Sequence, residues 1–245
     1  MELAPSTVMN DAQLRELAER LGAKAFVVGD VAPLGKGYQL TARVVATVEG
    51  KESLEVLATA ENAEALIGAV GNLAHKLRSG IGESLRSVAN APRLANATTA
   101  SLPALKAYTA ALRAEDEGDR PRGIELAKQA VSLDSTFAAA WEALAVMYLN
   151  RGNSAAAREA GNMAFRWRDR VPERPRLNLM GNYYTMHGKF DSAEQVFRQS
   201  TELYNRGWTS YADVLLNNGR LAAAESAAKR GVAENPVEAV GYWNL

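Results

Sequence analysis

A pattern that recurs about every 34 residues constrains the fold of residues 104–245 more than any other feature of the sequence. Its most regular member is a glycine, and successive copies are 34, 36 and 31 residues apart: Gly118, Gly152, Gly188 and Gly219. When these glycines are placed at position 15 of a 34-residue unit, positions 8 and 20 hold only small residues: Ala111, Ala145, Gly181, Ala212, Gly123, Ala157, Ala193 and Ala224. Small side chains let two antiparallel helices cross closely, and glycine suits the end of a helix. Each unit is therefore predicted to be a helical hairpin.

The other columns of the repeat resemble those of a known family. Position 4 is bulky in three of the four units, where it is Trp141, Leu177 and Trp208, and Pro236 occupies position 32 of the last unit. A 34-residue period with this order of large, small and proline positions resembles the tetratricopeptide repeat. The resemblance implies an α-solenoid of about four hairpins, with units over 104–137, 138–173, 174–204 and 205–238 and the start of a fifth at 239.

Two details of the repeat carry expectations of their own. Trp141 is expected to be buried between the two helices of its unit and the preceding helix, and the second helices are expected to be capped by Asp119, Asn153 and Asp191. The last glycine spacing, 31 residues, makes the fourth unit about three residues short. We expect the shortening between Trp208 and Gly219, which puts the first helix of this unit in doubt.

The first 90 residues follow a different pattern, which predicts a small α+β domain. Apolar residues at helical spacing predict helices over 11–21 and from Asn62 to about Arg86. Alternating apolar and polar residues between them predict an antiparallel meander of three strands, over 24–31, 38–48 and 54–58. Small residues around Pro92 mark 91–103 as a linker. The predicted fold is thus mainly α, with a small sheet domain before the repeat array.

Composition argues against several classes of function. Lys and Arg together number 28, as do Asp and Glu, so the basic excess of a nucleic-acid-binding protein is missing. No stretch approaches the roughly 20 apolar residues of a membrane span and no signal peptide is recognisable, which predicts no direct membrane insertion and a cytoplasmic location if the chain stands alone. There is no cysteine, and the two histidines, His75 and His187, lack neighbours at metal-ligand spacing. We therefore expect no catalytic residues, no metal and no cofactor, which means that the chain is not an enzyme.

The tetratricopeptide resemblance also implies a binding site. In such arrays the first helices line a concave groove, into which positions 2, 5, 9 and 12 point. The residues that this implies for a partner-binding groove are Tyr108, Leu112, Glu142, Val146, Leu149, Asn178, Asn182, Thr185, Arg206 and Asp213. Asn178, Asn182 and Arg206 are similar to the carboxylate clamp of chaperone-binding repeats, although the lysines of that clamp are missing. A protein or peptide partner against a mixed apolar and polar groove is the broader expectation.

Arginines gather where the second unit meets the third: Arg166, Arg168, Arg170 and Arg174. Guanidinium groups bind carboxylates and phosphates through paired hydrogen bonds, so one interpretation is an anion patch for an acidic or phosphorylated partner. The alternative is a solvated face on which Asp169 and Glu173 pair with these arginines.

Several segments, among them 97–108 and 168–174, look like the C-terminal region of large bacterial serine/threonine protein kinases and related signalling regulators that carry tetratricopeptide repeats. The kinase domain itself has no counterpart in the sequence. The resemblance implies a non-catalytic regulatory module of a larger bacterial signalling protein, extracytoplasmic if that protein is a membrane-anchored receptor kinase. Two alternatives stay open: a sensory region that binds a small molecule at the junction of the two domains, and a structural assembly module.

Both ends of the sequence predict surfaces that need a cover. Residues 239–245 restart the repeat and then stop, and three strands with two helices leave an open sheet edge. We expect the chain to be a piece of a larger protein, and the rival expectation is self-association through these exposed ends.

Overall fold

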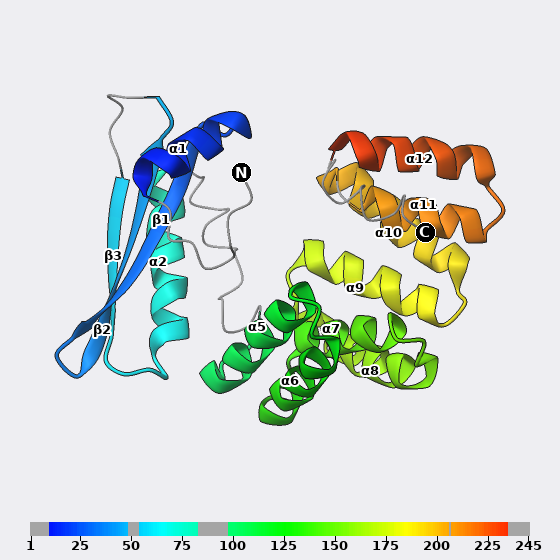
Figure 1. Ribbon diagram of the computed structural model, residues 1–245, viewed down its shortest axis with the longest axis horizontal. Coiled ribbons are helices and arrows are strands. Elements are labelled where there is room, and N and C mark those ends of the chain that lie inside the picture. Colours follow the sequence, from blue (N-terminus) through cyan, green and yellow to red (C-terminus); the bar gives the residue numbers. More distant parts are fainter. Residues whose placement is uncertain (1–9, 49–53, 83–97, 206, 235–245) are drawn as a thin grey trace. The chain divides into compact units, whose positions relative to one another are not determined.

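The two sequence patterns give two separate parts of the fold. The structure is a computed structural model that describes residues 10–48, 54–82, 98–205 and 207–234. Contacts divide the chain into Met1–Ala95 and Asn96–Leu245, a division inside the range predicted as a linker. In the described residues, the first part holds a three-stranded antiparallel sheet with two helices and the second holds four helical hairpins (Figure 1). The predicted fold class, mainly α with a small α+β domain before a helical array, is confirmed.

The α+β domain consists of a three-stranded meander with one helix before it and one helix after it in the sequence. Its elements in chain order are α1 (Asp11–Arg20), β1 (Ala25–Leu34), β2 (Gly37–Ala46), β3 (Leu54–Ala60) and α2 (Leu66–Gly80). Strand β2 lies in the middle, with Leu40 opposite Val31 of β1 and opposite Ala58 of β3. Gly35, with φ of 62°, makes the tight turn between β1 and β2. Both β1 and β3 are therefore edge strands of the sheet that the structure describes.

Helix α2 covers one face of this sheet. Side chains alternate between the two faces of a strand. On the face toward α2, Leu40, Ala42, Ala58 and Ala60 form a core with Ala69 and Leu73 of the helix. Arg43 points to the other face, where its Nη2 lies 2.9 Å from Asp11 Oδ2 at the start of α1. The helix predicted from 62 to 86 is shorter in the structure, because Ile81 is its C-cap and Gly82 takes a φ of 86°. Residues 83–86 lie outside the described part.

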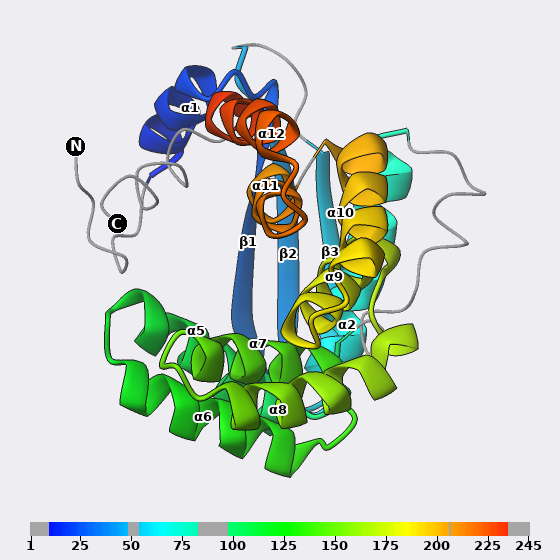
Figure 2. The same ribbon diagram turned by 90° about the vertical axis from the view of Figure 1, so that its right-hand side faces the viewer.

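The array repeats one hairpin four times within the described residues. Its helices are α5 (Leu102–Asp116), α6 (Arg120–Leu133), α7 (Ala138–Leu149), α8 (Ser154–Arg166), α9 (Glu173–Met186), α10 (Phe190–Tyr204), α11 (Trp208–Asn217) and α12 (Leu221–Glu234). The position-15 glycines end the first helices with φ values of 81°, 72°, 68° and 72°, as the spacing predicts. Within the array, α5 and α7 form one layer and α6 and α8 another (Figure 2).

The second helices do not all begin in the predicted way. Asp119 accepts a hydrogen bond from the backbone N–H of Arg122, and Asn153 accepts one from that of Ala156, so both are caps. Asp191 is not a cap, because α10 begins at Phe190 and places Asp191 in its first turn. There the carboxylate still interacts favourably with the positive end of the helix dipole.

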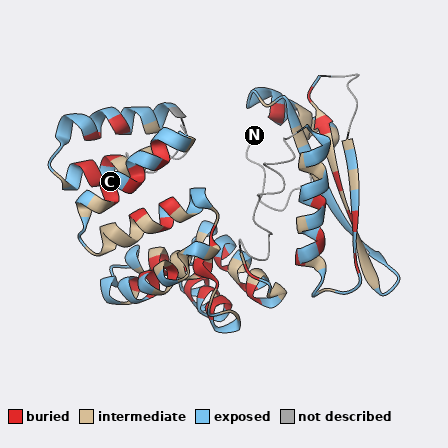
Figure 3. Cartoon of the chain, turned by 180° about the vertical axis from the view of Figure 1, so that it is seen from behind, coloured by how far each residue is buried: buried red, intermediate tan, exposed pale blue. Residues whose placement is uncertain are grey.

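The core of the array lies where the helices meet (Figure 3). Small residues at positions 8 and 20 are buried there, and the largest fully buried side chains include Phe137 and Phe197. Trp141 is only half-buried, so its predicted burial is wrong. Its ring packs against two clusters of core residues, but its Nε1 donates to the carbonyl oxygen of Ser135 at 2.9 Å in the α6–α7 loop. The polar edge of the indole is satisfied at the surface rather than in the core.

The short fourth unit loses the first turn of a helix and not the whole helix. The predicted place of the shortening, between Trp208 and Gly219, is wrong: these residues are 11 apart, the same spacing as from Trp141 to Gly152, so the deficit lies before Trp208. Helix α11 begins at Trp208, whereas α7 begins three residues before its tryptophan, at Ala138. The backbone turns sharply in front of α11, where Asn205 and Gly207 have φ of 49° and 82°.

Candidate binding site

The first helices of the second and third hairpins are joined by one carboxylate. Glu142 on α7 accepts hydrogen bonds at its Oε1 from Nδ2 of Asn182, at 3.1 Å, and from Nδ2 of Asn178, at 3.3 Å. The two asparagines are four residues apart on α9, so the helix presents both on one face. All three are among the residues predicted for the groove, and the structure brings them together.

Burial makes this carboxylate unusual. Loss of water around the half-buried Glu142 raises the pKa of its carboxyl group to about 7, although the hydrogen bonds from Asn182 and Asn178 act in the opposite direction. Tyr108 on α5 lies close enough to respond: burial raises the pKa of its hydroxyl, and the Glu142 carboxylate raises it further. The polar cluster thus extends over three successive first helices.

Exposed apolar side chains flank the cluster. Leu112 lies one turn after Tyr108 on α5, and Leu149 lies seven residues after Glu142 on α7, which places each leucine on the same helix face as its neighbour. Leu112 is 38% exposed and Leu149 is 43% exposed. We call this surface of α5, α7 and α9 the first-helix face, and define it by Tyr108, Leu112, Glu142, Val146, Leu149, Asn178, Asn182 and Thr185.

The other predicted groove residues have different surroundings. Val146 is half-buried, and the hydroxyl of Thr185 donates to the carbonyl oxygen of Gly181 in its own helix. Asp213 lies on α11, where partial burial raises the pKa of its carboxyl group. Arg206 lies outside the described residues. The similarity to a carboxylate clamp needs revision, because both asparagine amides already hold a carboxylate of the chain itself, that of Glu142.

The arginine cluster divides into two pairs. Arg168 stacks over the ring of Phe165 with its guanidinium carbon 4.3 Å from the ring centroid, and Arg170 donates to the hydroxyl of Thr136. Arg166 and Arg174 are exposed. Two of the four guanidinium groups, those of Arg168 and Arg170, are therefore already engaged within the array.

Two polar networks that the sequence did not reveal hold neighbouring segments of the array together. The buried Glu194 of α10 accepts hydrogen bonds from Asn218 at 2.8 Å and from Arg220 at 2.9 Å, both in the α11–α12 turn. The buried Thr99, just before α5, donates to Asp134 at 2.5 Å in the α6–α7 connection. Neither pair stands at a helical spacing, so no local pattern signals it.

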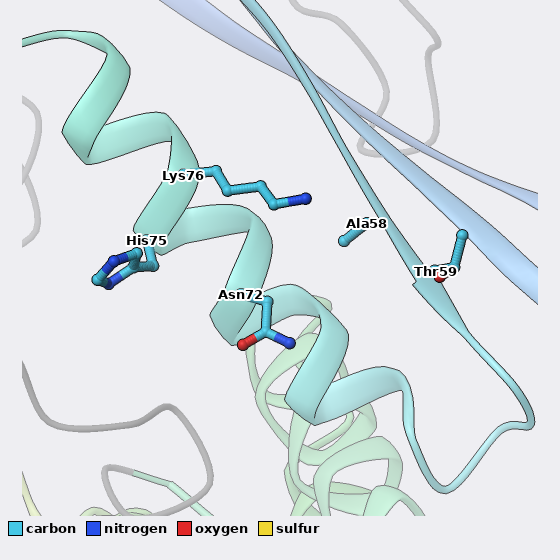
Figure 4. A pocket seen from close by; sticks show the side chains of 5 residues that line it. All are labelled: Ala58, Thr59, Asn72, His75 and Lys76. Carbon is cyan, nitrogen blue, oxygen red and sulfur yellow. The ribbon is translucent and has the colours of Figure 1, made fainter.

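A hollow of about 310 Å³ lies on the α+β domain, between α2 and β3. Its lining residues are Ala58, Thr59, Asn72, His75 and Lys76. Lys76 extends toward the sheet and donates to the carbonyl oxygen of Leu57 at 2.7 Å, whereas His75 points away from it (Figure 4). Most of the lining is exposed and polar, so the hollow is an open depression rather than an enclosed apolar pocket.

In the part of the chain that the structure describes, His, Asp and Glu side chains form no group of three or more that could hold a metal ion. None of the helices described is both long and apolar enough to span a bilayer.

Comparison with known proteins agrees with the geometry of the array. The family model for the tetratricopeptide repeat matches residues 104–170 and 178–239, more than half of the chain. No curated protein matches the sequence.

Three similar solved structures share low identity with it. The Cut9–Hcn1 hetero-tetramer of the APC/C is 18% identical, with 71% of this chain and 35% of that chain covered and a TM-score of 0.46. MamA is 17% identical; the match covers 72% of this chain and 95% of the MamA chain, with a TM-score of 0.40. The first repeat domain of Spaghetti (RPAP3), bound to the HSP90 peptide SRMEEVD, is 16% identical. The match covers 50% of this chain and 95% of that chain, with a TM-score of 0.41. The chain thus belongs to the tetratricopeptide-repeat family.

Proposed function

We propose that the first-helix face binds a peptide or an extended segment of a protein partner. The observation that carries the proposal is the row of side chains from Tyr108 through Glu142 to Asn178 and Asn182, which crosses three successive helices. A surface that continues across repeats suits an elongated ligand, because each repeat adds contacts along its length.

The chemistry of the face also supports a peptide as the ligand. Leu112 and Leu149 offer exposed apolar surface beside polar groups, and peptide sites commonly combine apolar anchors with a few oriented polar groups. Family membership agrees with this proposal, since repeat arrays of this kind present extended binding surfaces and act in general as scaffolds rather than as catalysts.

A finer assignment rests on resemblance alone. We propose that the chain is a regulatory module of a larger bacterial signalling protein, related to the kinases whose C-terminal regions it resembles. The order of segments in the sequence supports this context. Expressing the module with its natural flanking sequence and testing whether partner binding changes a linked enzymatic activity would examine it.

A matched pair of leucine substitutions tests peptide binding. A random peptide library displayed on phage is selected against the full chain, and the affinity of a recovered peptide is measured by fluorescence anisotropy. Leu149→Ser should weaken binding at least about tenfold, which is the loss of one buried apolar side chain. Leu133→Ser is the control, because Leu133 is exposed to a similar degree, 46% against 43%, but lies on the second helix α6.

The outcome distinguishes two surfaces. A recovered peptide that is insensitive to Leu149→Ser, or equally sensitive to both substitutions, would place peptide binding elsewhere on the chain. Circular dichroism of each variant confirms that the helical array is intact.

A further inference from the structure

Among the residues that the structure describes, one oxygen of the Glu142 carboxylate accepts hydrogen bonds and the other does not. Both asparagine amides donate to Oε1. Within the part of the chain that the structure describes, Oε2 receives no hydrogen bond, and it is not among the atoms that are buried without a partner. An acceptor oxygen that is accessible on a fixed carboxylate is therefore presented on the first-helix face.

This carboxylate also has no counter-ion within the part of the chain that the structure describes. No ion pair among the described residues involves Glu142. Buried or half-buried carboxylates are normally paired, because removing them from water is costly. By contrast, the half-buried Arg168 and Arg170 have their contacts elsewhere, at Phe165 and Thr136.

We propose that Glu142, held by Asn178 and Asn182 beside Tyr108, binds a positively charged lysine or arginine side chain of the peptide partner. This inference rests on the proposed peptide-binding function of the first-helix face and adds the chemistry that the face selects. A guanidinium or ammonium group donates to the free Oε2, while the asparagines keep the carboxylate oriented. Little reorganisation is then needed when the cation arrives.

The same arrangement disfavours acidic ligands. The clamp predicted from the sequence would hold a carboxylate of the peptide through Asn178 and Asn182, but those amides face Glu142. An incoming carboxylate would meet a like charge at short range in surroundings with little water, where repulsion is strong. Charge selects a basic segment over an acidic one.

The proposal predicts a pH dependence of binding. Tyr108 from α5 and the two asparagines from α9 are the groups that interact with the Glu142 carboxyl, whose pKa burial raises to about 7. A cation binds the ionised form, which falls to about one tenth of the molecules one pH unit below that pKa. The dissociation constant of a basic peptide should thus rise about tenfold from pH 8 to pH 6.

The experiment uses a peptide selected from the random library on the full chain, together with its variant in which the basic residue is replaced by glutamine. Glu142→Gln keeps the shape of the side chain and removes its charge. We expect Glu142→Gln to weaken the parent peptide about tenfold and to leave the affinity of the glutamine peptide unchanged. The pH dependence should be present in the wild type with the parent peptide and absent in the other three combinations.

Two results would overturn the inference. The first is a set of selected peptides without an excess of lysine and arginine. The second is a parent peptide whose affinity changes neither with Glu142→Gln nor with pH. If such peptides still lose affinity with Leu149→Ser, the first-helix face binds peptides of another chemistry and the proposed function stands. If their affinity is also unchanged by Leu149→Ser, both proposals fail. The pH series and the glutamine peptide need no protein variant, so a folding defect in Glu142→Gln would not prevent the test.

Discussion

Gly181 of α9 lies directly against the ring of Phe197 of α10. A Cβ atom built on Gly181 would stand less than 3.0 Å from Cζ, Cε1 and Cε2 of that ring. Phe197 is 1% exposed, so its ring has no free space into which to retreat. This contact is the physical reason for the small residue at position 8 of the third unit.

Gly181→Ala should therefore destabilise the array. Overpacking a closed core costs about 1–3 kcal/mol, and the better helix propensity of alanine returns up to about 1 kcal/mol. We expect the free energy of unfolding to fall by about 1–2 kcal/mol in denaturant melts followed by circular dichroism.

Gly161→Ala is the matched control for this substitution. Its Cβ would meet only Met186 Sδ, at 3.3 Å, at the end of a flexible side chain. The stability should stay within about 0.5 kcal/mol of the wild type or rise. Equal losses from the two substitutions would show that the α9–α10 contact is not as close as described.

Glu142 should make the stability of the array depend on pH. Burial raises its pKa from 4.5 to about 7 in the folded chain, so the folded state binds more protons than the unfolded state between these values. The contribution to stability is present below pH 4.5 and is lost as the pH rises through 7. Comparing wild type with Glu142→Gln, we expect the difference in unfolding free energy to change by about 2 kcal/mol between pH 5 and pH 8. A constant difference over that range would contradict the environment assigned to Glu142.

The ion pair between Arg220 and Glu194 should matter more than one at the surface. The side chain of Glu194 is 7% exposed, and Arg220→Ala would leave it with Asn218 as its hydrogen-bond donor. Since Arg220 itself is largely exposed, we expect a loss of about 1–2 kcal/mol rather than the full cost of a buried charge. Lys229→Ala breaks an exposed pair with Glu225, and we expect it to cost much less stability than Arg220→Ala. Thermal melts that rank the two variants in the opposite order would refute this assignment.

Thr99 should behave as part of the array, although it lies in the segment predicted as a linker. Burial alone would raise the pKa of Asp134, but hydrogen bonds from Thr99 and Thr136, helped by the Arg170 charge, hold that pKa below its usual value. Thr99→Val removes one of these bonds and should cost about 1–2 kcal/mol near pH 7.

The loss caused by Thr99→Val should shrink as the pH falls toward the range in which Asp134 becomes protonated. A lowered native pKa stabilises the fold above the unfolded value, and that stabilisation disappears in acid. Thr98→Val serves as the comparison, because Thr98 is less buried than Thr99. Identical unfolding curves for Thr99→Val and wild type at neutral pH would remove Thr99 from the array.

Structural features that depend only on the residues within one repeat could be predicted from the sequence. Glycine with a positive φ at position 15 needs no tertiary information, so the hairpins and the ends of their first helices could be predicted. Tyr108, Glu142 and Asn182 could be placed on first helices for the same reason. The two edges of the sheet followed from the alternation in 38–48 and its neighbours.

Relations between repeats were harder to see. That Asn178 and Asn182 hold Glu142 depends on how α7 and α9 are offset, and the offset is set by packing and not by a spacing within either helix. The half-buried position of Trp141 depends on a carbonyl in the preceding loop. The spacing of 31 residues shows that the fourth unit is short, and the structure places the loss in the first turn of α11, behind the turn at Asn205 and Gly207.

Glu142 belongs to one hairpin and its two asparagines belong to the next, so this carboxylate acts on the joint between repeats and not on the interior of either. In a solenoid, small rotations at each joint add up along the array and set its curvature. We therefore expect protonation of Glu142, or the pairing of its carboxylate with a ligand cation, to act on the angle between the second and third hairpins rather than on the packing within either one.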